Sequence, residues 1–212
     1  MEKSKFEILK IFGPSVLKVK IPNEILDSLN NYVDNIVVNE EKIKKLNHGE
    51  NLAGDVSQEF VLENDIMKST GWGNFLAKLV YEWVKIETGN KITKFNIQKS
   101  WIVRQFKNEY NPIHWHTGHI SGAGFLKVPT TLGGHFQDEK GEKKYLGGQL
   151  TLVHGSRQFM SNSKLQIIPQ VGDFYFFPNY LMHTVYPFKG TDEERRSISF
   201  NAFIDDDIVY DI

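Results

Sequence analysis

The chain has 212 residues, of which 40% are hydrophobic and 24% are charged, as is usual for a globular protein with a sizeable core. Its formal net charge of −1 argues against a protein that binds nucleic acid through charge alone. The absence of cysteine excludes disulfides, thiolate zinc sites and cysteine nucleophiles. The charged N-terminal segment lacks the apolar stretch of a secretory signal, and no run of about 18 apolar residues predicts a membrane span, so we expect a cytoplasmic protein.

The first part of the chain is predicted to contain a strand and two amphipathic helices. Residues 6–20 have strand character, interrupted at Gly13-Pro14. A helix is predicted from Asn23, a candidate N-cap, and a second from Trp72 to a stop near Gly89.

The intervening polar segments are predicted to be exposed. Residues 40–54 indicate a solvated face or loop, and residues 205–207 a solvated terminus. Residues 53–69 and 133–147 are expected to be long loops that shape substrate access.

From residue 94 onward the pattern changes to short strands separated by Gly, Pro, Asn and Asp. The predicted strands are 96–106, 122–128, 149–153, 165–168, 174–177 and 195–203. Such spacing favours a β-sandwich or barrel, and helices that precede the strands should pack on its outside. We therefore predict a mainly β protein with N-terminal helices, a single domain 1–212. Residues 1–93 would form a strand plus supporting helices, and residues 94–204 the barrel core.

Three of the seven histidines lie between residues 114 and 119. His114 and His116 are two residues apart, which on a β-strand points both imidazoles to one face. His183 follows an aromatic strand later in the chain. Because imidazole is the commonest metal ligand among side chains, His114, His116 and His183 predict a metal site inside the barrel.

The last predicted strand has two chemically different faces. One face carries Arg195, Ser197, Ser199 and Asn201, and the other carries Arg196, Ile198, Phe200 and Ala202. In a barrel covered by helices, the apolar face would meet the helices and the polar face would line the cavity. An arginine there needs an anion, and a carboxylate is its best geometric match. The strand therefore predicts a carboxylate-bearing ligand beside the metal.

Residues 96–204 resemble the Fe(II)/2-oxoglutarate-dependent dioxygenases. Within that family the chain is most similar to an uncharacterised bacterial and phage subgroup with HxH, SGxYY and RxSxxFN patterns. The resemblance rests on the histidine pair, on the strands Ser121–Leu126 and Gly147–Leu150, on the aromatic strand before His183, and on the Arg-x-Ser motif twelve residues after that histidine. It implies a double-stranded β-helix, the jelly-roll or cupin-like barrel, buttressed by helices.

The resemblance also implies a chemistry and its residues. His114, His116 and His183 would hold Fe(II), and Arg195, helped by Ser197, would bind the distal carboxylate of 2-oxoglutarate. With O2, the cosubstrate would be decarboxylated to succinate while an unactivated carbon of the substrate is hydroxylated. The partner would be a small molecule or a peptide, not nucleic acid or membrane, and a homodimer is left open.

One position departs from the family pattern. The usual ligands are two histidines and one carboxylate, with Asp or Glu two residues after the first histidine, where this chain has His116. Asp138 or Glu139 could supply the carboxylate, or His119 could replace His116. Arg104 is a rival partner for the cosubstrate, although a salt bridge is its favoured role.

Two other functions remain as alternatives. A cupin-type metalloenzyme would use three histidines without 2-oxoglutarate, which the HxH pair favours and the Arg195 strand opposes. A non-catalytic jelly-roll module, for binding or structure, would leave the histidines far from one another.

Overall fold

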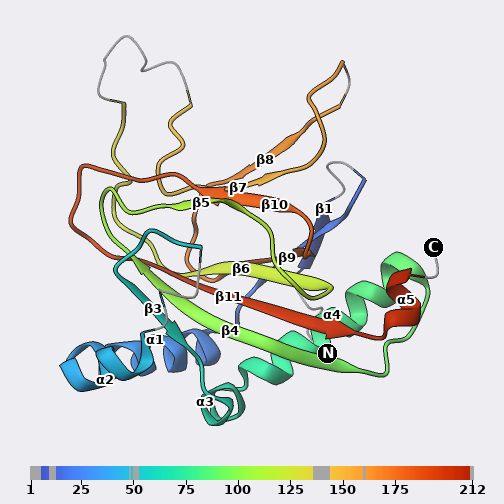
Figure 1. The fold of residues 1–212 in the computed structure, drawn as a ribbon, viewed down its shortest axis with the longest axis horizontal. Coiled ribbons are helices and arrows are strands. Elements are labelled where there is room, and N and C mark those ends of the chain that lie inside the picture. Colours follow the sequence, from blue (N-terminus) through green and yellow to red (C-terminus); the bar gives the residue numbers. More distant parts are fainter. Residues whose placement is uncertain are drawn as a thin grey trace.

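The computed structural model describes residues 6–9, 13–47, 49, 53–135, 144–159 and 161–210. Two antiparallel sheets face each other in it (Figure 1). The larger sheet has the strand order β1 (Phe6–Leu9), β2 (Val16–Lys20), β9 (Asp173–Pro178), β6 (Ile120–Lys127), β11 (Arg195–Ile204), β4 (Phe95–Gln105), β3 (Gln58–Val61). The smaller sheet has the order β5 (Asn111–His114), β10 (Met182–Val185), β7 (Leu150–Val153), β8 (Lys164–Ile167). The chain crosses repeatedly between the sheets, as the predicted jelly roll requires.

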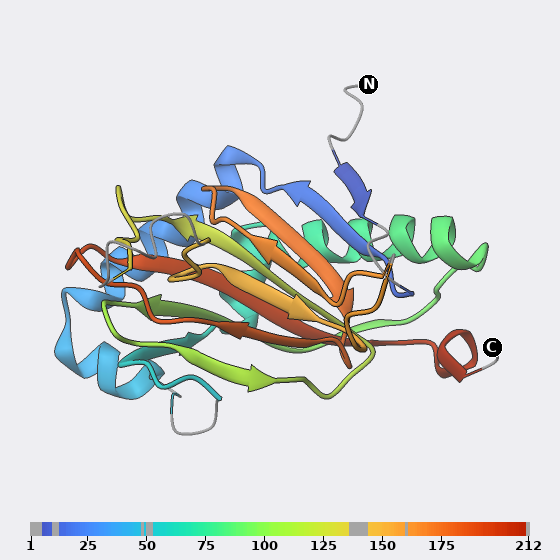
Figure 2. The same ribbon diagram turned by 90° about the horizontal axis from the view of Figure 1, so that it is seen from above.

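Helices cover the side of the larger sheet that faces away from the smaller one (Figures 1 and 2). The helices are α1 (Asn23–Val37), α2 (Glu40–Leu46), α3 (Asn64–Ser69), α4 (Trp72–Thr88) and α5 (Asp206–Tyr210). Both long helices confirm the sequence prediction, and α4 stops at Gly89, whose φ of 76° is left-handed. Asn23 is not the cap of α1: Pro22 holds that position, and Asn23 is the first helical residue.

Strand β9 of the larger sheet packs in apolar cores on both faces, which is why its sequence is a continuous aromatic run. Phe174 and Phe176 pack in the core between sheet and helices, whereas Tyr175 and Phe177 pack in the core between the two sheets. A strand buried on both sides loses the alternation of a half-exposed strand. The neighbouring strand β6 makes room for this packing, because a Cβ on Gly122 would lie 2.6 Å from the Phe174 ring.

Several segments predicted as loops form short regular elements. Within residues 53–69 the chain forms β3 and α3, residues 40–46 form α2, and residues 206–210 form α5. Helix α2 is begun by Asn39, whose side chain accepts a hydrogen bond from the Lys42 backbone N–H. Each of these elements carries only two or three apolar residues, too few to show a hydrophobic period, so the sequence pattern missed them.

Arg196 lies on the helix side of β11 and ties the sheet to α1. Its side chain is 1% exposed and lies 2.7 Å from both Glu194 and Asp34, and it also donates to Asn30. Arg104 binds the same Glu194 at 2.7 Å, which confirms the predicted salt bridge. Burial alone would raise the pKa of Glu194, but hydrogen bonds from Arg104 and Arg196 lower it to about 2.

Replacing Glu194 with glutamine is expected to lower the free energy of unfolding at pH 7 by roughly 3–5 kcal/mol, because the buried guanidinium of Arg196 and the partly buried one of Arg104 lose their shared anion. The carboxyl pKa is lowered in the folded state, so its stabilisation is present above the ordinary value of 4.5 and is lost as the pH falls towards about 2. Urea unfolding at pH 7 measures the loss. The control is Asp192→Asn, since Asp192 is 83% exposed. Equal stability of the two variants would contradict the proposed role of Glu194.

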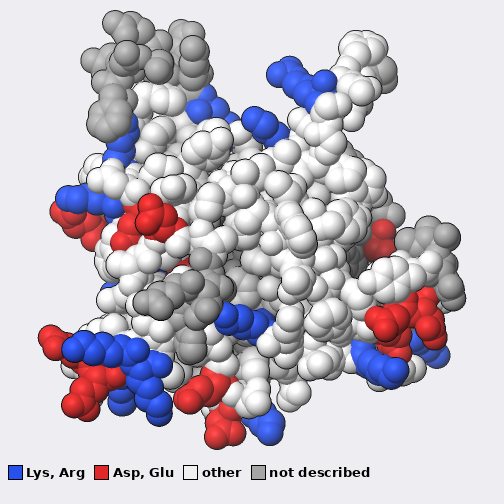
Figure 3. Space-filling view, viewed as in Figure 1, with Lys and Arg blue, Asp and Glu red and all other residues white. Residues whose placement is uncertain are grey.

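The surface shows no large field of one sign on the side drawn in Figure 3, where basic and acidic side chains alternate around the rim. This mixture agrees with the net charge of −1. None of the helices in the described part of the chain is long and apolar enough to cross a membrane.

Candidate metal centre

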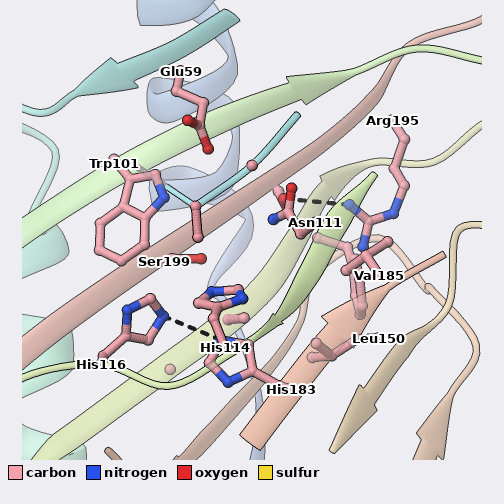
Figure 4. A pocket seen from close by; sticks show the side chains of 16 residues that line it. Glu59, Trp101, Asn111, His114, His116, Leu150, His183, Val185, Arg195 and Ser199 are labelled. Atoms are coloured by element: carbon pink, nitrogen blue, oxygen red, sulfur yellow. Dashed lines mark hydrogen bonds between the residues drawn. The ribbon is translucent and has the colours of Figure 1, made fainter. Parts of the chain in front are cut away.

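The structure brings His114, His116 and His183 together between the two sheets. His114 ends β5 and His183 lies directly opposite it on β10 in the strand register. One ring nitrogen from each of the three residues lies within 4.8 Å of the others, and the ring centroids are 4.3–4.8 Å apart. Figure 4 shows the three rings turned towards a common point. A non-catalytic module was expected to keep these histidines apart, and they converge.

His116 reaches the cluster by a route that differs from the predicted one. Strand β5 ends at His114, so strand alternation does not orient His116. Instead, the His116 backbone N–H donates to the Asn179 carbonyl oxygen, and the Asn179 side chain donates to the His116 carbonyl oxygen. The chain then turns at Gly118, whose φ is 101° and whose Cβ, if present, would lie 2.9 Å from the Ala202 oxygen. A loop clamped by Asn179 therefore holds this imidazole.

Backbone carbonyls set the tautomers of two of the histidines. The His114 Nδ1 lies 2.7 Å from the Pro112 oxygen, and the His183 Nδ1 lies 3.0 Å from the Leu181 oxygen. Each Nδ1–H donates to its carbonyl, which leaves the Nε2 lone pair available for a metal. In metal-ligating histidines the second ring nitrogen commonly donates to a carbonyl oxygen in this way.

The spacing of the His116 and His183 nitrogens fits a single metal ion. The Nε2 atoms of His116 and His183 are 3.1 Å apart. Two nitrogens that bind one ion at about 2.1 Å, at a right angle to each other, are separated by about 3.0 Å. The donor set is therefore suited to a transition metal such as Fe(II), Zn(II) or Co(II).

Burial keeps these imidazoles neutral. It lowers the pKa of His116 to about 3, and the neighbouring His183 and His114 lower it further in the same direction. Burial likewise lowers the pKa of His183 to about 4, with His114 as the next cause, and burial lowers the pKa of His114. Neutral imidazole is the form that binds metals, so the cluster is prepared for an ion at neutral pH.

No carboxylate belongs to this cluster in the described part of the chain. Asp138 and Glu139, the expected alternative donors, lie outside the described residues. His119 does not replace His116: its Nδ1 accepts the backbone N–H of Ile204, and its ring packs against Phe203 and Tyr210. The imidazole of His119 thus anchors the end of β11 and helix α5.

Arg195 lines the same cavity as the histidines and has no acidic partner among the described residues. The side chain is 2% exposed and donates to the Gly148 carbonyl, to the Gln105 side chain and, at 3.4 Å, to the Ser197 hydroxyl. Its guanidinium carbon also lies 5.1 Å from the Phe125 ring centroid. Burial lowers the pKa of Arg195 to about 10, so the group stays charged at neutral pH. A buried cation with only neutral partners fits an anionic ligand.

The two faces of β11 behave as the sequence predicted. Arg195, Ser197 and Ser199 line the cavity. Ile198, Phe200 and Ala202 lie in the core that the larger sheet shares with the helices. Asn201 lies outside this lining and borders a neighbouring hollow that shares His114 and His116 with the cavity and also includes the 60%-exposed Trp115.

Three further cavity residues were not identified from the sequence as binding groups. Glu59 projects from β3, which the sequence analysis took for a loop, and Asn111 begins β5. Trp101 of β4 also lines the cavity, and its ring centroid lies 5.5 Å from that of His116. The one sequence signal for Glu59 is its position directly before the apolar pair Phe60-Val61.

One family model matches the part of the chain that carries these residues. Residues 99–201 match the family model described as "Putative 2OG-Fe(II) oxygenase". That segment contains the three histidines together with Arg195 and Ser197. No curated protein sequence matches the chain.

Two solved structures share the fold. One is the viral collagen prolyl hydroxylase of Paramecium bursaria Chlorella virus-1 in complex with 2-oxoglutarate, with a TM-score of 0.53, 14% identity, and coverage of 88% of this chain and 94% of that one. The other is a Pseudomonas putida prolyl-4-hydroxylase, with a TM-score of 0.52, 11% identity, and coverage of 95% of this chain and 92% of that one. At these identities the similarity establishes the architecture, a double-stranded β-helix with N-terminal helices.

Proposed function

We propose that the protein is an Fe(II)- and 2-oxoglutarate-dependent dioxygenase that hydroxylates a still unidentified substrate, because residues 99–201 match the family model described as "Putative 2OG-Fe(II) oxygenase". The observation that carries the proposal is the buried Arg195, without an acidic partner among the described residues, in the cavity lined by His114, His116 and His183. A metal and an anion are the two ligands that this cavity suits.

Each residue has a defined part in this function. His114, His116 and His183 would hold Fe(II), while Arg195 and Ser197 would bind the distal carboxylate of 2-oxoglutarate. When bound, the metal and cosubstrate would supply O2-dependent hydroxylation coupled to the decarboxylation of 2-oxoglutarate to succinate and CO2. The protein orients both and excludes water, since the walls of the cavity include the buried Phe125 and Leu150.

A second candidate is a cupin-type metalloenzyme that uses three histidines without 2-oxoglutarate. The specific observation in its favour is the all-histidine cluster, which lacks a carboxylate among the described residues. It offers no ligand for Arg195, which is why we rank it second.

Anaerobic titration with Fe(II), with and without 2-oxoglutarate, tests the proposal. We expect a visible metal-to-ligand charge-transfer band that requires both components, and succinate formation once O2 is admitted. Metal binding without the band and without any turnover of 2-oxoglutarate would favour the cupin-type enzyme. Failure to bind metal would contradict both candidates.

A further inference from the structure

Glu59 is a buried carboxyl group that the proposed oxygenase chemistry leaves without a role. It lies opposite Val103 in the β3–β4 register, so its side chain shares the cavity side of the sheet with Trp101. The residue is 1% exposed, and among the described residues neither carboxyl oxygen forms a hydrogen bond, while Oε2 is fully enclosed. Burial raises the pKa of Glu59 to about 7, although the charge of Lys99 acts in the opposite direction.

A second acceptor without a partner lies close to it. The side-chain oxygen Oδ1 of Asn111 is buried and also lacks a hydrogen-bond donor. A Cβ on Gly54 would lie 2.8 Å from Asn111 Oδ1 and 3.0 Å from Glu59 Oε1, so both oxygens border one small space that Gly54 leaves open. Buried acceptors are rarely left unsatisfied, and each costs free energy unless a ligand supplies the donor.

This acceptor pair is continuous with the metal centre. Glu59, Asn111 and Gly54 line the same cavity as the three histidines. Trp101 connects the two parts, since its ring stands 5.5 Å from that of His116, and Figure 4 shows Glu59 above this indole and Arg195 on the opposite side of the pocket. The cavity therefore has a cationic end and an end made of acceptors.

The chemistry of the acceptor end selects one kind of group. An ammonium ion offers up to three N–H donors and the charge that a buried carboxylate lacks, and it is attracted to the face of an indole ring. A carboxylate or phosphate would be repelled by the Glu59 carboxylate, and an alcohol would leave the charge of Glu59 unbalanced. We propose that Glu59 and Asn111 bind an ammonium group of the primary substrate, beside Trp101, so that the oxygenase acts on an amine. This inference rests on the proposed function for the metal centre and adds to it the substrate class.

Binding of a small ammonium probe tests the inference without requiring turnover. The protein is loaded with Zn(II), which does not react with O2, and with 2-oxoglutarate. Binding of n-butylammonium and of its neutral analogue 1-butanol is then compared by ligand-observed NMR. The variant Glu59→Gln keeps the shape of the side chain and removes its charge. The matched control is Glu63→Gln, which changes an exposed glutamate outside the cavity.

We expect n-butylammonium to bind more tightly than 1-butanol and to lose roughly 10- to 100-fold in affinity in Glu59→Gln, the loss typical of a buried hydrogen bond to a charged group. Glu63→Gln should bind the probe like the wild type. Equal binding of the two probes, or unchanged ammonium binding in Glu59→Gln, would overturn the inference. A variant that loses Zn(II) affinity but still binds the ammonium would also overturn it, and would assign Glu59 to balancing the charge of the metal.

The same samples separate this inference from the proposed function. If 2-oxoglutarate fails to bind the Zn(II) protein while n-butylammonium binds in a Glu59-dependent way, the cosubstrate assignment fails and the amine site stands. If 2-oxoglutarate binds and the ammonium does not, the amine site fails and the cosubstrate assignment stands.

Discussion

The variant Arg195→Met is expected to bind 2-oxoglutarate at least about 100-fold more weakly than the wild type, because removing one partner of a buried charge pair costs about 3 kcal/mol or more. Metal binding should persist, since Arg195 contributes no atom to the histidine cluster. Isothermal titration of 2-oxoglutarate into the metal-loaded protein measures the loss. The effect should appear in the affinity for the cosubstrate and not in the number of metal sites.

Stability supplies an independent readout for the same variant. Without ligands, Arg195 is a buried cation whose described partners are all neutral, so its replacement by an apolar side chain of similar length should cost no more than about 1 kcal/mol of unfolding free energy. The control Arg196→Met should instead be strongly destabilised, because Arg196 pairs with Glu194 and Asp34. An Arg195→Met protein that binds 2-oxoglutarate normally would remove the main support for the cosubstrate site.

The sequence predicted the larger parts of the fold wherever a long hydrophobic pattern existed. The two helices with apolar stripes, the aromatic strand β9 and the two-faced strand β11 all appear as expected. Strand β11 was especially informative, because ten residues of alternating polarity determine which side chains face the cavity. The placement of Arg195 in the cavity and of Arg196 against α1 followed from that alternation alone.

The parts of the site that the sequence did not predict depend on contacts between distant segments. His116 was expected to share a strand face with His114, yet its position depends on Asn179, 63 residues further along the chain. Glu59 lies on a four-residue strand, too short to establish a period of two, so its inward direction is visible only from its pairing with β4. Pairing partners of this kind come from tertiary structure and leave no local pattern.

The all-histidine cluster changes the charge of the cavity relative to a site with two histidines and one carboxylate. Three neutral histidines leave a divalent metal with its full charge, and Arg195 adds one more positive charge nearby. A dianionic 2-oxoglutarate would offset two of these three charges and leave one positive charge, which a carboxylate ligand would otherwise remove.

Replacing His116 with alanine is expected to weaken metal binding at least about 100-fold. Mutating a residue that only hydrogen-bonds to a metal ligand typically lowers metal affinity about 10- to 100-fold, and removing the ligand itself should cost more. The variant His116→Asp is expected to retain the metal, since a carboxylate oxygen is a suitable donor for Fe(II) or Co(II). Chelator competition measures the affinities, and the visible spectrum of the Co(II) protein reports the change in the donor set.

His119→Gln separates the cluster from the other histidine of this segment. His119 anchors Ile204 and lies outside the cluster, so the variant should lose stability at the end of β11 and keep its metal affinity. If His119→Gln lost the metal while His116→Ala kept it, the cluster as we describe it would be wrong. If His116→Ala and His116→Asp lost the metal equally, the third position would require imidazole. Metal binding would then depend on all three histidines, and a carboxylate could not take the place of His116.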